Sequence, residues 1–283
     1  MSEEPTAIQT VQTAMAAQVT WLGHATAMVS FGESRVLIDP LGRRRTSKLP
    51  DYAAILITHS HVDHLNRWTL GKLDKQAMLI VPQGAGPIVA DLGFSLVKEV
   101  EPGDQLSIGG MSMGRLSVEC VPTRHDNGRW RKGDSPLCTG YVISANGVSI
   151  HHAGDIDMSN FTLFDDIGKR FALDATLLPI GGMLPVWYYR RRQSALDRGV
   201  HIDPDTALAI FEQLGARTLI PIHWGTVNLR LGPPSAPKNR LLRVAKAANK
   251  LERVSILAHG ESLQVAGNEN ASEEMTGGKK FKK

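Results

Sequence analysis

The fold of this chain is decided by one stretch, Thr58-His59-Ser60-His61-Val62-Asp63-His64. In this histidine loop (residues 58–64), three imidazoles and one carboxylate fall within six positions, directly after the apolar run 53–57. So short an apolar run, followed at once by polar residues, is typical of a buried strand that ends in a loop. Imidazole nitrogens and carboxylate oxygens are ligands of zinc and similar ions. On an extended loop, His59 and His61 point the same way and can share one ion, and Asp63 and His64 then point toward a second. A polar loop with chance histidines is the alternative interpretation.

Three further candidate ligands each follow a strand-like run of apolar and β-branched residues: His125, Asp155 and His223. With the histidine loop, four strand-to-loop transitions therefore deliver metal-binding groups. Rigid strands that aim side chains from adjacent loops are how a scaffold fixes a site. Asp39 stands at a fifth such transition. An Asp before Pro suits a turn, but we favour a hydrogen bond between Asp39 and the histidine loop, which would orient the ligands.

These residues make the chain resemble the metallo-β-lactamase superfamily, whose hallmark is the pattern HxHxDH. The resemblance runs from about Val19 to Gln264, and within the superfamily it is strongest to N-acylphosphatidylethanolamine-hydrolysing phospholipase D and its bacterial relatives. The supporting strings are Trp21-Leu22-Gly23-His24-Ala25-Thr26, Ala153-Gly154-Asp155, Leu178-Pro179-Ile180-Gly181, His201-Ile202-Asp203-Pro204 and Ile222-His223-Trp224-Gly225-Thr226. His24 lies in a turn that resembles the family's first loop, and we expect it to support the site rather than to bind metal.

The resemblance implies an α/β fold, an αββα sandwich with a dinuclear metal site at one edge of the sheets. The first ion would be held by His59, His61 and His125, and the second by Asp63, His64 and His223. Asp155 would bridge the two ions. We expect zinc, with manganese or iron as alternatives, because sites that contain carboxylates also take those ions.

The expected chemistry follows from the paired ions. A hydroxide held between them is a nucleophile at neutral pH and can attack phosphorus or a carbonyl carbon. Asp155 would hold this hydroxide in position and accept its proton. By resemblance, His201 lies in the substrate pocket, where it would bind a phosphate or protonate a leaving group. The alternative for His201 is a histidine that only precedes a helix.

A second set of substrate residues is predicted in the segment 183–192. Aromatic residues beside arginines suit a phosphate-bearing or lipid-like ligand. Trp187, Tyr188 and Arg190, together with His201, are therefore the candidate substrate-binding residues. The alternative is a loop with an aromatic anchor and a solvated run of charges.

The composition fits one enzyme domain. In this chain of 283 residues the candidate ligands are spread over both halves, so we expect a single domain at 18–265 between flexible polar tails at 1–17 and 266–283. The net charge of +4 is too mild to argue for nucleic-acid binding. Cys120 and Cys138 form no spaced motif and indicate reduced thiols of a cytoplasmic protein, with a disulfide as the alternative. No apolar run reaches the ~20 residues of a membrane span, and the acidic N-terminus is unlike a secretory signal.

Two helices are predicted from their end signals. One spans about 204–214, with Asp203 as its N-cap and Gly215 as its stop. The other spans about 239–251, where apolar residues align on one face.

We therefore predict a dinuclear metal-dependent hydrolase, specifically a phosphodiesterase of the phospholipase D type. Its substrate would be a small-molecule or phospholipid-like phosphodiester, with peripheral membrane contact as one consequence, and no nucleic-acid partner is expected. Two alternatives stay open. The same site could hydrolyse lactones or other carboxylic esters, or the chain could be a nucleic-acid- or membrane-binding module with weak or no catalysis.

Overall fold

The structure, a computed structural model, describes residues 16–42, 46, 49–109, 115–125, 137–157, 162–181, 201–226 and 233–267. Its strands are β1 (Ala16–Gly23), β2 (Thr26–Phe31), β3 (Ser34–Ile38), β4 (Ala54–Leu56), β5 (Met78–Pro82), β6 (Val97–Val100), β7 (Gln105–Ile108), β8 (Leu116–Pro122), β9 (Thr139–Ala145), β10 (Val148–His152), β11 (Ala175–Pro179), β12 (Thr218–Ile222) and β13 (Ser262–Ala266). Its helices are α2 (Arg67–Leu70), α3 (Gly86–Val89), α4 (Thr162–Arg170), α7 (Pro204–Leu214) and α8 (Ala236–Ala247), with short 3-10 turns at Ala90–Leu92 and Leu251–Arg253.

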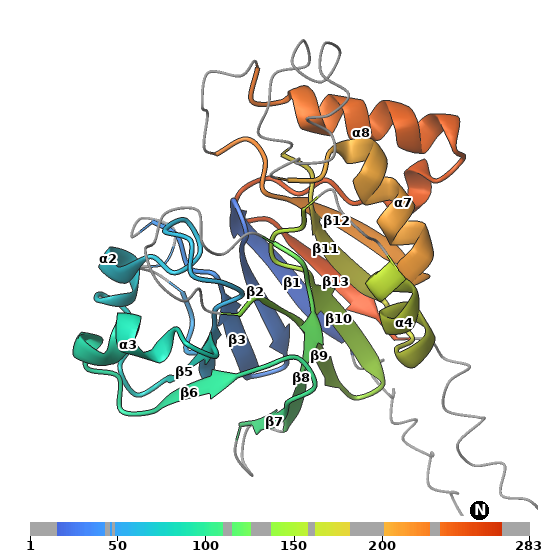
Figure 1. The fold of residues 1–283 in the computed structure, drawn as a ribbon. Coiled ribbons are helices and arrows are strands. Elements are labelled where there is room, and N and C mark those ends of the chain that lie inside the picture. The colour runs from blue at the N-terminus through green and yellow to red at the C-terminus, as the bar shows by residue number, and fades with distance from the viewer. Residues whose placement is uncertain are drawn as a thin grey trace, which may run out of the picture.

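The strands form two mixed sheets that face each other. One has the order β13-β1-β2-β3-β4-β5-β6 and the other β12-β11-β10-β9-β8-β7. Alternate side chains of each sheet face opposite sides: Ala54 and Leu56 of β4 lie in the core between the sheets, whereas Ile55 faces the layer that contains α2 and α3. In the second sheet, Leu177 faces the same central core and Leu178 faces α4, α7 and α8. The two helical layers thus cover the outer faces (Figure 1), and the predicted αββα sandwich is confirmed.

The strand directions bring the candidate ligands to common edges. In the first sheet, β2 lies antiparallel between β1 and β3, and β3 is parallel to β4. In the second, β9 lies antiparallel between β8 and β10, and β10, β11 and β12 are parallel. The carboxyl ends of β1, β3 and β4 therefore share one edge, as do those of β8, β10 and β12. Apart from His201, which precedes α7, every candidate site residue among the described residues follows one of these strand ends.

One predicted helix is confirmed at its stated ends and the other is displaced. Helix α7 spans Pro204–Leu214; the Asp203 side chain accepts a hydrogen bond from the Thr206 backbone N–H, and Gly215 ends the helix with φ +63°. Helix α8 begins at Ala236 and ends at Ala247, earlier at both ends than predicted. Proline is tolerated in a first turn, which lets the helix start beside Pro237, and Asn249 adopts the left-handed φ of +54° just after it ends.

The two ends of the described chain meet in the first sheet. Ala16 of β1 pairs with Ala266 of β13, so both strands reach slightly into the segments predicted as tails. Residues 1–15 and 268–283 lie outside the described ranges. No described helix is long and apolar enough to cross a membrane. Cys120 and Cys138 are buried and are not joined in a disulfide.

Candidate metal centre

The ligands predicted from the sequence meet at one place between the two sheets. The histidine loop follows β4 of the first sheet, and His125, Asp155 and His223 follow β8, β10 and β12 of the second. His125, Asp155 and His223 are all buried. A residue cluster assembled from both sheets is fixed by the packing of the whole sandwich rather than by one loop.

The first group consists of His59, His61, His125 and Asp155, whose ligand atoms lie within 4.8 Å of one another. His61 Nδ1 is 3.1 Å from His125 Nε2, and His125 Nε2 is 3.7 Å from Asp155 Oδ2. Two nitrogens bound to one tetrahedral ion at ~2.0–2.1 Å lie roughly 3.3–3.4 Å apart. The spacing of this group therefore suits one shared cation.

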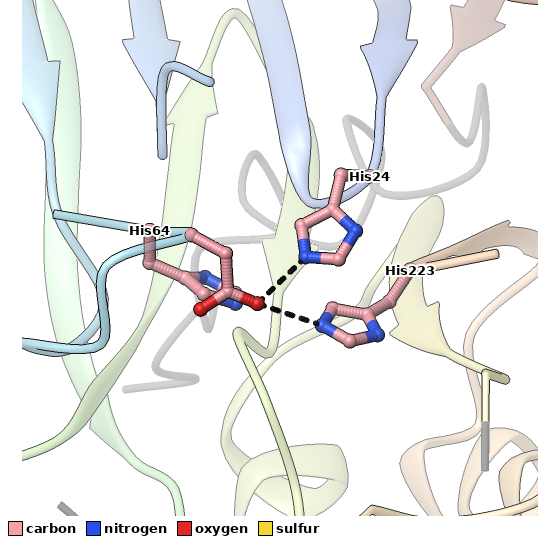
Figure 2. Close-up of side chains that lie close together, drawn as sticks. His24, His64 and His223 are labelled. Atoms are coloured by element: carbon pink, nitrogen blue, oxygen red, sulfur yellow. Dashed lines mark hydrogen bonds and ion pairs between the residues drawn. The ribbon is translucent and has the colours of Figure 1, made fainter. Parts of the chain in front are cut away.

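The second group consists of Asp63, His64 and His223, joined by His24. His64 Nε2 and His223 Nε2 lie 3.2 Å and 3.4 Å from Asp155 Oδ2. His223 Nε2 is also 3.8 Å from Asp63 Oδ2, and Figure 2 shows the rings of His24 and His223 on the same side of the cluster. Asp155 thus lies against both groups, at the position where a carboxylate could contact two ions.

His201 lies at the same place, although it comes from the segment before α7. Its Nδ1 is 3.3 Å from Asp155 Oδ2, and its ring centre is 5.1 Å from that of His125 and 4.8 Å from that of His223. His201 is the one predicted substrate residue that lies within the described residues. The other three, Trp187, Tyr188 and Arg190, lie outside the described residues.

The hydrogen bonding of the cluster is incomplete within the described residues. The buried atoms without a hydrogen-bond partner there include Nε2 of His59, His61, His64 and His223, Nδ1 of His201 and both carboxylate oxygens of Asp155. Each such atom costs about 1–3 kcal/mol, and native folds contain few of them. Because nitrogen and carboxylate donors converge here, a divalent cation would satisfy them together, and the residues fit a metal centre.

Burial and mutual proximity set the charges of the cluster. Burial lowers the pKa of His59 well below its usual range and that of His61 to about 4. Burial alone would raise the pKa of Asp155, but the surrounding imidazoles, His223 foremost, hold it well below its usual value. Neutral imidazoles and an ionised carboxylate are the protonation states that bind metal.

Asp39 contacts the histidine loop at three atoms. Its Oδ1 accepts the Thr58 backbone N–H at 2.8 Å, and its Oδ2 accepts the Thr58 hydroxyl at 2.6 Å and lies 2.7 Å from His64 Nδ1. Burial lowers the pKa of His64, but the carboxylates of Asp155 and Asp39 outweigh this and raise it well above its usual value. A metal that binds His64 must therefore displace a proton.

Two supporting residues were not assigned a role from the sequence. Asp157 Oδ1 lies 2.8 Å from His125 Nδ1, and Thr226 Oγ1 lies 3.0 Å from His24 Nδ1. The sequence could have indicated Asp157, because it stands two positions after Asp155. Alternate residues of an extended segment point to the same side, so both carboxylates would face the site. Thr226 ends one of the resemblance strings, but its partner is remote in sequence.

The backbone of the site is held in an uncommon conformation. His24, Asp39 and His223 have φ values of +55°, +44° and +59°. Residues other than glycine rarely adopt this region, and such strain gathers at functional sites. Gly181 packs so closely on His223 that a Cβ there would clash with the His223 carbonyl oxygen. The surrounding fold therefore dictates where the His223 ring points.

Sequence comparisons agree with this architecture. Residues 30–224 match the family described as a beta-lactamase superfamily domain. An uncharacterized protein of Mycobacterium tuberculosis is 29% identical over 252 residues, 81% of this chain and 64% of that protein. A UPF0173 metal-dependent hydrolase of Methanoregula boonei is 27% identical over 251 residues, 87% of this chain and 97% of that protein. An N-acyl-phosphatidylethanolamine-hydrolyzing phospholipase D of Caenorhabditis elegans is 25% identical over 236 residues, 73% of this chain and 63% of that protein. The chain thus spans less than two thirds of the mycobacterial and nematode relatives.

Solved structures share the fold at lower identity. Igni18, a metallo hydrolase of Ignicoccus hospitalis, has a TM-score of 0.65 at 21% identity, over 89% of this chain and all of that chain. CmlA, a diiron β-hydroxylase of Streptomyces venezuelae, has a TM-score of 0.64 at 19% identity, over 93% of this chain and 55% of that chain. Because the fold is shared by different chemistries, it does not by itself set the reaction. With a family match over most of its length, and with this two-sheet fold, the chain belongs to the beta-lactamase superfamily.

Proposed function

We propose that this protein is a metal-dependent hydrolase that binds two divalent ions and cleaves phosphodiesters of the phospholipase D type. The position of Asp155 is the observation that carries the proposal. Its buried Oδ2 lies 3.7 Å from His125 of the first group and 3.2 Å from His64 of the second. A carboxylate shared by two nitrogen-rich groups is the arrangement that a paired site needs. Zinc is the proposed ion, since imidazole and carboxylate ligands suit it.

The residues of the site have distinct parts in such a reaction. Bound divalent ions would act as Lewis acids and lower the pKa of water toward ~7. The side chain of Asp63 is 30% exposed, whereas Asp155 is buried, so solvent and substrate would reach the cluster from the Asp63 side. Asp155 would accept the proton of the attacking water. His201, whose Nδ1 lies beside Asp155, would donate a hydrogen bond to a phosphate oxygen and hold the phosphorus there.

The choice of a phosphodiester is supported by the likeness to the nematode phospholipase D and by the place of His201 in the cluster. A serine hydrolase is the less favoured mechanism. Residues 110–114 do match the Gly-x-Ser-x-Gly pattern of such enzymes. That pattern works at a turn from a strand into a helix, whereas residues 110–114 connect β7 to β8, two antiparallel strands.

Activity profiling of the purified protein tests the proposal. Its metal content would be measured by elemental analysis, and a soluble phosphodiester, an N-acyl phospholipid and a lactone would be offered in parallel. We expect about two ions per chain and hydrolysis of one or both phosphodiesters. Hydrolysis of the lactone alone would replace the proposed reaction with carboxylic ester hydrolysis at the same metals. Binding without turnover of any of them would favour a binding module.

A second test addresses Arg190, Arg191 and Arg192, which lie outside the described residues. A charge-assisted hydrogen bond to a phosphate oxygen contributes about 1.5–3 kcal/mol. Their joint replacement by alanine should therefore lower phosphodiester hydrolysis by about ten- to more than a hundred-fold, with lactone hydrolysis and metal content unchanged.

The matched control for this variant removes the same charge elsewhere. Replacement of the exposed Lys72, Arg243 and Lys246 by alanine should leave turnover near that of the parent. Equal turnover of both triple variants at low salt would mean that the arginine segment is a solvated loop.

A phospholipid substrate would also determine where in the cell the protein acts. It would bring the protein from the cytoplasm into peripheral contact with a membrane surface. The modest net charge of +4 gives no reason to propose a nucleic-acid partner. Sedimentation with phospholipid vesicles would test the membrane contact.

A further inference from the structure

His24 differs from the other histidines of the second group in the partners of its ring. His24 Nε2 lies 2.9 Å from Asp63 Oδ2, the contact drawn in Figure 2, and His24 Nδ1 lies 3.0 Å from Thr226 Oγ1. His64 and His223 each leave Nε2 without a hydrogen-bond partner among the described residues. Both ring nitrogens of His24 are therefore occupied by protein atoms, whereas each of the two ligand candidates keeps its Nε2 open among the described residues.

The chemistry of the three groups sets the direction of these hydrogen bonds. An ionised carboxylate only accepts, so the proton between His24 and Asp63 lies on His24 Nε2. A neutral imidazole with its proton on Nε2 accepts at Nδ1, so the Thr226 hydroxyl donates to His24. The hydrogen bonds run from Thr226 through His24 to Asp63. His24 Nε2 therefore carries a proton and offers no lone pair to a metal.

The ring of His24 is held firmly in this place. Its side chain is 2% exposed and its ring centre is 3.9 Å from that of His223. Its carbonyl oxygen accepts hydrogen bonds from Trp21 Nε1 and from the His223 backbone N–H, both at 2.8 Å. Asp63 is more open, with a side chain that is 30% exposed. A fixed donor beside a more exposed ligand can keep that ligand from turning toward water.

We propose that His24 is a positioning residue that, together with Thr226, holds the Asp63 carboxylate toward the ion bound by Asp63 and His223, without binding that ion itself. This inference rests on the proposed metal centre and deepens it. It assigns to the Thr226–His24–Asp63 chain the function of setting the affinity of one ion and not of the other.

Metal titration of the purified, metal-free protein tests this, with Zn²⁺ or Co²⁺ in competition with a chelator. An Asp63→Ala variant identifies the binding step that depends on Asp63. We expect His24→Ala to weaken that same step by about 10–100-fold and to leave any other step unchanged. His24→Gln, whose amide can donate to Asp63, should recover most of the affinity, and its Co²⁺ spectrum should match that of the parent. Thr226→Val should weaken the same step to a smaller extent.

Thr176→Val is the matched control. Thr176 Oγ1 lies 2.8 Å from Nδ1 of the buried His151, so this variant also breaks a buried threonine–histidine hydrogen bond, but one that involves no candidate ligand. Its metal affinities should equal those of the parent. Thermal unfolding of each metal-free variant shows which variants fold. If His24→Ala does not fold, His24→Gln and Thr226→Val provide the test instead.

Two results would overturn the inference. One is an unchanged Asp63-dependent step in His24→Ala. The other is a loss in His24→Gln as large as in His24→Ala, with Thr226→Val unaffected, which would make His24 a ligand. Because the readout is metal binding, a failure to hydrolyse phosphodiesters would contradict the proposed reaction alone. An Asp63→Ala variant with unchanged metal binding would instead remove the metal centre on which the inference rests.

Discussion

Asp39 Oδ2 lies 2.7 Å from His64 Nδ1, and both side chains are completely buried. This contact turns the other ring nitrogen of His64 toward Asp155, 3.2 Å away. The same carboxylate accepts two hydrogen bonds from Thr58, at the start of the histidine loop. One buried carboxylate thereby orients a ligand and the loop that carries it.

Replacement of Asp39 by asparagine should therefore weaken metal binding by about 10–100-fold, the usual effect of losing a group that orients a ligand. The amide keeps the shape of the side chain but offers one acceptor oxygen in place of two. Chelator competition measures the effect. Asp174→Asn is the control, because the partners of this buried carboxylate are Ser149 and Arg217. Equal metal affinity in both variants would contradict the orienting role of Asp39.

Removal of metal should lower the stability of the protein as well as its activity. Buried nitrogen and oxygen atoms of the cluster that have no hydrogen-bond partner among the described residues would gain one when cations bind. Binding to the folded state alone stabilises it by about 2.7 kcal/mol at a free-metal concentration 100-fold above Kd. Thermal unfolding before and after chelation, followed by readdition of Zn²⁺, measures this. Full activity in a protein whose metal content is near zero would exclude the proposed chemistry.

Loss of one ligand should separate metal binding from folding. His61→Ala removes an imidazole whose Nδ1 is 3.1 Å from His125 Nε2, so we expect turnover to be abolished and metal content to fall. His151→Asn changes a buried histidine outside the cluster and should keep the parent's metal content. Elemental analysis of both proteins, prepared in parallel, decides between these outcomes.

Gly181 should be intolerant of even one added methyl group. A Cβ there would clash with the His223 carbonyl oxygen and would lie 3.1 Å from His223 Nδ1. We expect Gly181→Ala to cost about 1–3 kcal/mol through overpacking and to weaken metal binding, because His223 must move. Gly147→Ala is the control: its φ of +77° makes an L-residue costly, but nothing lies within 4 Å. It should lose stability by about 1 kcal/mol and keep its metal affinity.

His151 should make the protein less stable in mild acid. Burial lowers the pKa of His151 to about 3, whereas in the unfolded chain it is about 6.5. Between these values the unfolded state binds the additional proton, so stability falls as the pH decreases from about 6.5 toward 3, by at most about 1.4 kcal/mol per pH unit. Metal-free His151→Asn should show a shallower decline in denaturant titrations from pH 7 to 5. An identical slope in parent and variant would mean that His151 is not responsible.

Local sequence was sufficient for those parts of the fold and site that depend on neighbouring residues. The histidine loop is recognisable because its ligands lie within a few positions of one another after an apolar run. Helix α7 was predicted to its ends because its N-cap at Asp203 and its stop at Gly215 adjoin it in the chain. Helix α8 begins earlier than predicted because Pro237 fits its first turn, and it ends earlier because Asn249 adopts a left-handed φ just beyond it.

The contacts between remote residues were decided only by the tertiary structure. Asp157 lies 32 positions from its partner His125, and Thr226 lies 202 positions from His24. No local pattern encodes such pairs, because they arise when β2 and β9 reverse the chain and align the carboxyl ends of β1, β3, β8, β10 and β12. The sequence alone could therefore name the candidate metal ligands and point to Asp39 and His24 as their supports. The Asp157–His125 contact depends on the strand order of the second sheet, and the Thr226–His24 contact depends on how the two sheets pack against each other.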